Sequence, residues 1–248
     1  MPDWLLPVLA SPFIGSFLGV LIQRLPEGDD LVASRSRCNS CQRNLGAADL
    51  IPIVSYLAAR GRCRHCGAPI GRFHLLIELG ALLVAVWAAT VDDGLRLWAD
   101  CVLGWTLLAL AWIDARHMIL PDVLTLPLVL AGLVFAWFLD PPFIADHAIG
   151  AMAGWLLFWT ISHVYRRLRG RDGLGEGDAK LMAAAGAWLS WMGLGPVMLV
   201  GAVTGLAVAL TMRLRGRDIS GATAIPFGPP LAFAIWVVWI YAPSMLGM

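Results

Sequence analysis

Eight apolar segments constrain this chain most, because each is close to the roughly 20 residues that a helix needs to cross a bilayer. They lie near residues 4–23, 74–91, 95–113, 121–139, 146–165, 179–193, 195–212 and 226–244. Only 14% of the 248 residues are charged and 59% are hydrophobic, whereas about a quarter of the residues in soluble domains are charged. The sequence therefore predicts an all-α, polytopic membrane protein with eight transmembrane helices.

A polar stretch divides the chain into three predicted parts. Residues 1–23 form a first transmembrane helix, residues 24–73 a polar loop domain, and residues 74–248 a membrane-embedded domain with the other seven helices. The first helix is expected to be retained in the mature protein. No basic residue precedes it and Arg24 follows it, which is not the pattern of a secretory signal peptide.

Basic residues fall almost entirely on one side of this eight-helix arrangement. Of the 18 lysines and arginines, 17 lie on that side and only Arg96 lies on the other. Four acids lie with Arg96, namely Asp92, Asp93, Asp140 and Asp146. Positive charge stays in the cytoplasm, so the polar loop is expected to be cytoplasmic. The net charge of +1 gives no indication of a nucleic-acid partner.

Four cysteines in the polar loop form two Cys-x-x-Cys pairs. Cys38 and Cys41 are separated by 21 residues from Cys63 and Cys66, and each pair can place two thiolates on one tetrahedral zinc ion. Disulfides are disfavoured in the cytoplasm, and four protein ligands leave no open position for catalysis, so a structural zinc is expected. His65 could substitute as a ligand. A redox role, or no joint role, are the alternatives.

Two aspartates stand at the ends of apolar segments on the predicted cytoplasmic side. Asp114 ends the third segment, and Asp178 opens the sixth within the sequence Gly-Glu-Gly-Asp. Ionisable residues at membrane depth are functional candidates. The structural alternative is that Asp178 caps its helix and that Asp114 ends its own helix beside Arg116 or another cation. Asp122 is predicted to be the N-cap of the fourth segment.

Such a pair suits aspartyl protease chemistry. Two carboxylates at about 3 Å share one proton, so one can activate a water while the other hydrogen-bonds the scissile carbonyl. Gly175 and Gly177 are predicted to let an extended substrate backbone come close, because they carry no side chain. A substrate for this site is a membrane-inserted helix with a basic leader at the cytoplasmic face.

The histidines and the fifth cysteine give weaker indications. His117, close to Asp114 in the sequence, could interact with the aspartate pair or lie at the headgroups. Cys101 is expected to be a buried apolar residue of the third segment. Three further histidines at segment ends are interpreted as interfacial, namely His74, His147 and His163.

Five motifs in order resemble the type IV prepilin peptidases, a family of GxGD-type membrane aspartyl proteases also called leader peptidase/N-methyltransferases. The resemblance covers nearly the whole chain. Its motifs are Gly15-Ser16-Phe17-Leu18 with Arg24-Leu25-Pro26, the paired cysteine loop, Ile113-Asp114 with Leu120-Pro121-Asp122, Gly175-Glu176-Gly177-Asp178, and Ile225-Pro226-Phe227-Gly228-Pro229.

The resemblance implies a bacterial inner-membrane endopeptidase whose catalytic residues are Asp114 and Asp178. It implies cleavage of the basic leader of type IV prepilins or type II secretion pseudopilins, followed by S-adenosylmethionine-dependent methylation of the new N-terminus. Two departures concern the methylation. Gly19 stands where the family signature has asparagine, and Phe73-His74-Leu75 stands where many members have Arg-Tyr-Pro. A peptidase without methyltransferase activity is therefore the alternative.

Three other classes of protein compete with this interpretation. A solute transporter with a zinc-stabilised loop is disfavoured because no internal repeat is visible in the sequence. A thiol–disulfide oxidoreductase would use its cysteines at the oxidising face, whereas here they are expected in the cytoplasm. An assembly scaffold would not need both Asp114 and Asp178.

Overall fold

A computed structural model describes residues 2–28, 36–170, 175–216 and 225–246. These residues are helical or irregular, with two isolated β-bridges and no strand, which confirms the all-α prediction. The chain divides into two compact units, Met1–Ala109 and Leu110–Met248. The three-part division expected from the sequence places its boundaries elsewhere and stays a prediction.

Unit 1 contains α1 (Leu5–Arg24), α3 (Phe73–Ala88) and the first part of α4 (Gly94–His117). Helices α1 and α3 pack closely at Gly15, where no side chain separates them. A Cβ added to Gly15 would lie 2.7 Å from the Cα of Glu78. Trp105 of α4 donates a hydrogen bond from Nε1 to the carbonyl of Ala81 in α3, at 3.0 Å. A polar loop between α1 and α3 carries short turns, namely η1 (Leu25–Glu27), η2 (Ala47–Asp49) and α2 (Val54–Ala58).

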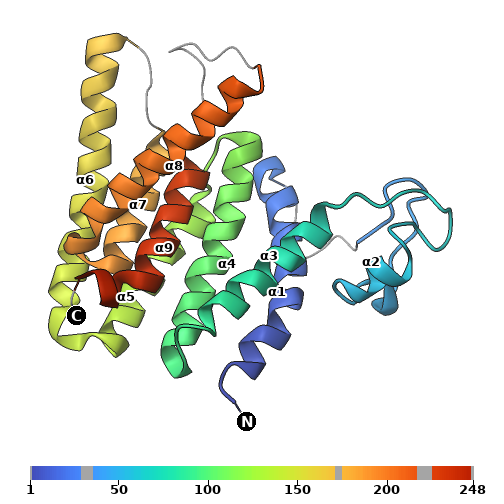
Figure 1. The fold of residues 1–248 in the computed structure, drawn as a ribbon. Helices are drawn as coiled ribbons and strands as arrows, with labels where there is room; N and C mark the ends of the chain where they lie inside the picture. Colours follow the sequence, from blue (N-terminus) through green and yellow to red (C-terminus); the bar gives the residue numbers. More distant parts are fainter. Residues whose placement is uncertain (1, 29–35, 171–174, 217–224, 247–248) are drawn as a thin grey trace. The chain divides into compact units, whose positions relative to one another are not determined.

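Unit 2 is a helical bundle around α7 (Figure 1). Its helices are α5 (Asp122–Leu139), α6 (Ile144–Arg169), α7 (Glu176–Leu189), α8 (Leu194–Leu214) and α9 (Gly228–Leu246), with the short turns η3 (Pro141–Phe143) and η4 (Trp191–Gly193). From Ala179 to Leu189 nearly every residue of α7 is buried, because α5, α6, α8 and α9 all contact it. Small residues permit this, and a Cβ on Gly186 would meet the backbone carbonyl of Gly150 in α6.

Trp188 fills the space between α7 and its neighbours in unit 2. It is 1% exposed and donates a hydrogen bond from Nε1 to the carbonyl of Leu128 in α5, at 2.9 Å. Its ring lies against Gly132, where a Cβ would come within 2.6 Å, and meets the ring of Trp239 edge-on at 5.2 Å. Large and small residues thus interlock around the C-terminal end of α7 and anchor it to α5 and α9.

Five helical segments of the described chain are long and apolar enough to cross a membrane. They are Leu5–Glu27, Gly94–His117, Asp122–Leu139, Pro141–Leu168 and Trp191–Leu214. Two shorter apolar helices are Phe73–Ala88 and Gly228–Tyr241. All eight predicted segments fall on helices, but eight transmembrane spans are not confirmed. The predicted sixth span corresponds to α7, whose 14 residues reach only about 21 Å.

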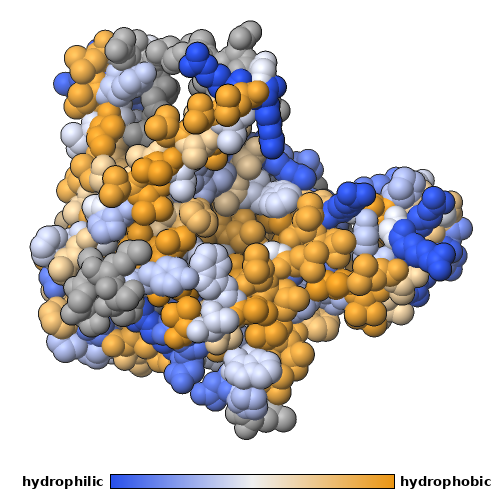
Figure 2. All heavy atoms as spheres, in the orientation of Figure 1, coloured by the Kyte–Doolittle hydropathy of each residue, from blue (hydrophilic) through white to orange (hydrophobic). Residues whose placement is uncertain are grey.

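Hydrophobic side chains remain exposed on the helices, as a lipid environment requires (Figure 2). Helix α8 illustrates this with a stripe of residues that are each more than half exposed. The stripe consists of Leu199, Val203, Leu206 and Leu210. In water such a surface would aggregate, so the arrangement agrees with the membrane protein predicted from the composition.

Candidate active site and metal centre

Asp114 lies in the last turn of α4 and is 6% exposed. Its Oδ2 accepts a hydrogen bond of 2.8 Å from the backbone N–H of Gly228, the first residue of α9. The N-terminus of a helix carries a partial positive charge and unpaired N–H groups, so it stabilises a carboxylate placed there. A residue 114 positions away in the sequence therefore holds Asp114 in place.

Asp178 lies in the first turn of α7 and is 8% exposed. Its Oδ2 accepts a hydrogen bond of 3.1 Å from the backbone N–H of Gly175, which is the N-cap residue of the helix. Asp178 thus closes the first turn from within the helix and is not itself the N-cap. Helix capping therefore explains the hydrogen bond to one carboxylate oxygen of Asp178. It does not explain why the side chain is buried.

The two aspartates interact electrostatically in unit 2. Each uses Oδ2 to accept a backbone N–H at a helix N-terminus, Gly228 for Asp114 and Gly175 for Asp178. Two buried carboxylates that act on each other favour a state in which they share one proton. Both aspartates are therefore buried in unit 2 within range of each other's charge, which their positions in the sequence alone did not show.

Asp122 has a different environment. It is the first residue of α5, whose N-cap is Pro121, so the prediction that Asp122 is the N-cap was wrong. Its Oδ1 lies 2.5 Å from Nζ of Lys180, one turn into α7, and its side chain is 55% exposed. The pair connects the start of α5 to the start of α7, next to Asp178. Asp122 is therefore exposed and ion-paired, whereas Asp114 is buried.

The two glycines predicted to bind substrate differ in their surroundings. A Cβ on Gly177 would lie 2.8 Å from Cβ of Leu120, so this glycine permits close packing of the α7 N-terminus on the chain before α5. Gly175 is exposed, and a Cβ there would be 3.5 Å from Oδ2 of Asp178, an ordinary contact. Substrate contact with Gly175 and Gly177 stays a prediction.

The four cysteines of the polar loop come together in unit 1. Ligand atoms of Cys38, Cys41, Cys63 and Cys66 all lie within 4.8 Å of one another. A tetrahedral zinc with Zn–S bonds of about 2.3 Å requires sulfurs roughly 3.8 Å apart. The sulfurs of Cys38 and Cys66 are 3.9 Å apart, so the cluster fits a zinc ion. His65 is exposed and lies outside this cluster.

The two cysteine pairs have the same backbone conformation. Gln42 N–H donates to the carbonyl of Cys38 and Gly67 N–H donates to the carbonyl of Cys63, both at 2.9 Å. Gln42 and Gly67 each follow the first cysteine of their pair by four residues and have positive φ, 56° and 71°. The loop therefore contains two equivalent knuckles that face each other across the metal position.

The thiols of the cluster differ in their pKa values. Backbone N–H groups of Cys41 and Ser40 donate to the sulfur of Cys38 and lower its pKa to about 6. At Cys66 a hydrogen bond from the Ala68 backbone lowers the pKa of the thiol. Desolvation and the neighbouring thiols outweigh it and raise this pKa to about 11. A divalent metal binds thiolates, so its binding would displace the protons that the four thiols still carry.

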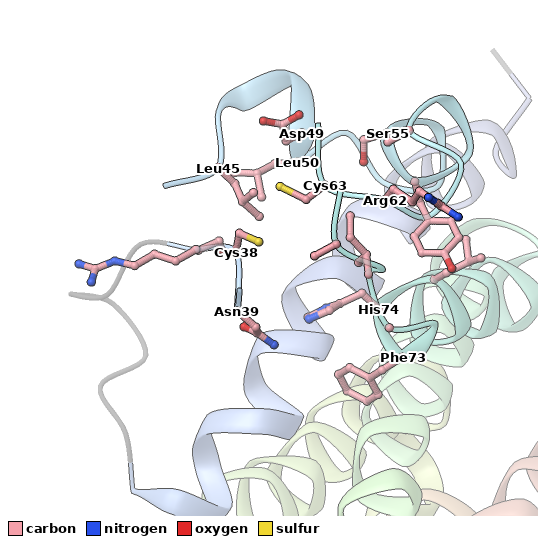
Figure 3. A pocket seen from close by; sticks show the side chains of 18 of the residues that line it. Cys38, Asn39, Leu45, Asp49, Leu50, Ser55, Arg62, Cys63, Phe73 and His74 are labelled. Carbon is pink, nitrogen blue, oxygen red and sulfur yellow. The ribbon is translucent and has the colours of Figure 1, made fainter. Parts of the chain in front are cut away.

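A cavity of about 570 Å³ lies beside this cluster in unit 1 (Figure 3). Its lining comes from α1, both knuckles, α2 and the start of α3, and Figure 3 shows Asn39, Cys63 and His74 around the same hollow. Glu78 lines it too and is 7% exposed. In the sequence Glu78 stands out as a residue that the family resemblance retains, and no individual role was predicted for it, although an acid within an apolar segment was a signal for one.

Two of the other minor predictions can be compared with the structure. Cys101 is fully buried in α4, as expected. His147 was expected at the membrane interface but is 7% exposed. Its Nδ1 lies 2.9 Å from the carbonyl of Ala187, and its Nε2 lies 3.6 Å from Oδ2 of Asp140. His147 therefore packs inside unit 2, where it connects α6 to α7.

Comparisons with known proteins cover both units. Residues 9–91 match the bacterial peptidase A24 N-terminal domain, and residues 101–210 match the type IV leader peptidase family. The chain is 39% identical over 262 residues to the prepilin leader peptidase/N-methyltransferase of Aeromonas hydrophila, covering 96% of this chain and 90% of that protein. No solved structure matches the chain.

Two further relatives carry the same description. The prepilin leader peptidase/N-methyltransferase of Burkholderia pseudomallei is 41% identical over 246 residues, covering 88% of this chain and 79% of that protein. The one from Pseudomonas aeruginosa is 34% identical over 266 residues, covering 96% and 90%. The similarity therefore covers at least 88% of this chain and at least 79% of each relative.

Proposed function

This chain belongs to the type IV leader peptidase family, and we propose that it is a membrane aspartyl endopeptidase whose catalytic pair is Asp114 and Asp178. It removes the basic leader from type IV prepilins or type II secretion pseudopilins and then methylates the new N-terminus. The observation that carries the catalytic assignment is the pair of buried, mutually interacting carboxylates, each held by a helix N-terminal N–H.

The proposed reaction follows from the shared proton. The ionised aspartate takes a proton from a water molecule, which attacks the scissile carbonyl carbon. The protonated aspartate donates a hydrogen bond to the carbonyl oxygen and stabilises the negative charge that develops there. Because Oδ2 of each aspartate is already held by Gly228 or Gly175, the other oxygens are available for these roles. The mechanism needs no metal.

We assign the zinc ion a structural role. Four thiol ligands, in two equivalent knuckles, satisfy a tetrahedral zinc completely and leave no coordination position for water or substrate. Zinc therefore stabilises the fold of the loop and takes no part in peptide hydrolysis.

The sidedness of the site follows from the distribution of charge. With 17 of 18 basic residues on one side of the predicted arrangement, the cysteine loop and both aspartates face the cytoplasm of a bacterial inner membrane. A prepilin whose helix lies in the bilayer would present its leader junction at the same headgroup level. Substrate and lipid bilayer are thus the partners, and no nucleic acid is expected.

A cleavage assay tests the proposal. The wild type, Asp114→Asn and Asp178→Asn are reconstituted in nanodiscs with a prepilin, and release of the leader is followed. Each substitution should reduce cleavage by about 10²- to 10⁴-fold, because it removes an acid–base group. Asp93→Asn is the matched control, since this aspartate is exposed and outside the site. Cleavage at the wild-type rate by either site variant would reject the aspartyl mechanism.

Methylation is read in the same reaction. Labelled S-adenosylmethionine is added, and transfer of label to the cleaved product is measured. Label on the N-terminal amine of the product would establish the second activity. Cleavage without label would identify this chain as a peptidase that lacks methyl transfer, the alternative that the departures at Gly19 and at Phe73-His74-Leu75 suggest.

A further inference from the structure

An ion pair joins the start of α5 to the start of α7 in unit 2. Lys180 of α7 places Nζ 2.5 Å from Oδ1 of Asp122, the first residue of α5. The two side chains are 29% and 55% exposed. An ion pair in contact with solvent to this degree contributes little to stability. Its location, between the segments that carry Asp114 and Asp178, points to a role in the site instead.

Lys180 and Asp178 belong to the same turn of α7. They are two residues apart in the helix, and one turn contains 3.6 residues. Backbone hydrogen bonds make such a turn stiff, so a shift or rotation that displaces Lys180 displaces Asp178 as well. The ion pair therefore fixes the backbone of Asp178 relative to the start of α5.

The start of α5 is in turn connected to Asp114 by a short and well-held segment. Only residues 118–121 lie between the end of α4 at His117 and Asp122. Met118 has φ 55°, and its N–H donates to the carbonyl of Asp114 at 2.9 Å, which closes the last turn of α4. Movement of Asp122 is thus transmitted to the turn that carries Asp114.

Packing at the same junction supplies the opposing force. A Cβ on Gly177 of α7 would lie 2.8 Å from Cβ of Leu120, which belongs to the segment between α4 and α5 and is 9% exposed. This close contact limits how near α7 can come to the segment, whereas attraction between Lys180 and Asp122 opposes its movement away. The two effects together determine the spacing of α7 from the end of α4.

We propose that Asp122 and Lys180 are positioning residues, whose ion pair holds Asp178 at the separation from Asp114 at which the two carboxylates share a proton. The inference rests on the proposed function, because it concerns the pair that cleaves the leader. Neither Asp122 nor Lys180 takes part in proton transfer. Loss of the ion pair should leave the fold intact and let the two catalytic turns move relative to each other.

Steady-state leader cleavage by the intact protein in nanodiscs tests the inference. Lys180→Met and Asp122→Ala should each lower kcat at least about 10-fold with a clearly smaller change in KM, because the reacting groups lose their position and substrate contacts remain. The melting temperature should change little, since the pair is exposed. Lys180→Arg keeps the charge and should retain most of kcat. The control Asp92→Asn breaks a different exposed ion pair, with Arg96 at 3.5 Å, and should cleave at the wild-type rate.

The double variant Asp122→Ala/Lys180→Met shows whether the two residues act together. It should cleave no more slowly than the slower single variant, because the second substitution removes the partner of a contact that is already lost. Losses that multiply, or a wild-type kcat in both single variants, would overturn the inference. Asp114→Asn, measured alongside, reports on the proposed function separately: its loss of cleavage leaves the aspartyl mechanism standing whatever the ion-pair variants do, and its continued cleavage would reject that mechanism as well.

Discussion

At the scale of single residues, the position of Asp114 depends on a glycine far away in the sequence. Gly228 donates its N–H to Oδ2 of Asp114 at 2.8 Å, and a Cβ added to Gly228 would lie 2.6 Å from the same oxygen. No real Cβ approaches an atom so closely, so either the carboxylate or the start of α9 would have to move. The geometry of the aspartate pair is therefore sensitive to one methyl group.

We predict that Gly228→Ala reduces leader cleavage by at least about 10-fold, because catalysis depends on the position of the reacting group to a fraction of an ångström. The turnover number should fall more than the substrate affinity. Gly195→Ala is the matched control, since a Cβ there meets no atom within 4 Å. If both alanine variants cleave at the wild-type rate in the nanodisc assay, contact with Gly228 does not position Asp114.

At the scale of elements, the two knuckles of the polar loop have little hydrophobic core of their own. Among their residues only Cys63 is buried, and the 3.5 Å ion pair between Arg64 and Asp49 is partly exposed to solvent. Exposed ion pairs contribute about 0–1 kcal/mol, so they cannot hold a loop of this length in one conformation. Binding of zinc to four thiolates supplies that stabilisation instead.

Metal analysis should find one zinc ion per chain, and Cys41→Ser should lose it. Removal of zinc by a strong chelator should make residues 36–70 sensitive to limited proteolysis, because the loop then lacks its main stabilising contact. Cobalt substitution should give the absorption bands of a tetrahedral thiolate site. Cys101→Ser, in a cysteine outside the cluster, should retain the zinc. Full zinc content in Cys41→Ser would contradict the four-cysteine site.

The contact between α6 and α7 is a second feature at this scale. Gly186 of α7 lies so close to Gly150 of α6 that no side chain fits between the backbones. Backbone atoms cannot turn aside as a flexible side chain can. The first turn of α7, which carries Asp178, therefore depends on small residues along this contact.

Gly186→Ala should destabilise the protein by about 1–3 kcal/mol, as overpacking does in closely packed cores, and should lower cleavage by moving Asp178. Thermal unfolding in nanodiscs measures the first effect, and the leader assay measures the second. Gly205→Ala in α8 is the control, since a Cβ there would have its nearest neighbour at 3.5 Å, an ordinary contact. An unchanged melting temperature for Gly186→Ala would show that α6 and α7 can separate without cost.

At the scale of the whole molecule, the charge distribution predicts the orientation in the membrane. Alkaline phosphatase, active only outside the cytoplasm, should be active when fused after residue 92 or residue 140. A green fluorescent protein fused after residue 60 or residue 170 should fluoresce, because those positions lie in loops rich in arginine. The opposite pattern would place the cysteine loop and both aspartates outside the cytoplasm and would reject the proposed sidedness.

Local patterns in the sequence predicted much of this protein. Apolar runs predicted helices at all eight positions, since hydrophobic length is a property of contiguous residues. The spacing of Cys38, Cys41, Cys63 and Cys66 predicted the cluster, because each knuckle is closed by hydrogen bonds within a few residues. Five motifs in order predicted the family that the comparisons identified.

Only the tertiary structure decided the features that depend on residues distant in the chain. The sequence placed Asp114 and Asp178 on one side of a membrane, but the contact with Gly228 arises from the packing of α9 in unit 2. It predicted an apolar segment at α7, but the enclosure of α7 by four other helices is visible only in the structure. Hydropathy and spacing describe neighbours along the chain, whereas burial and long-range hydrogen bonds are set by which helices pack together.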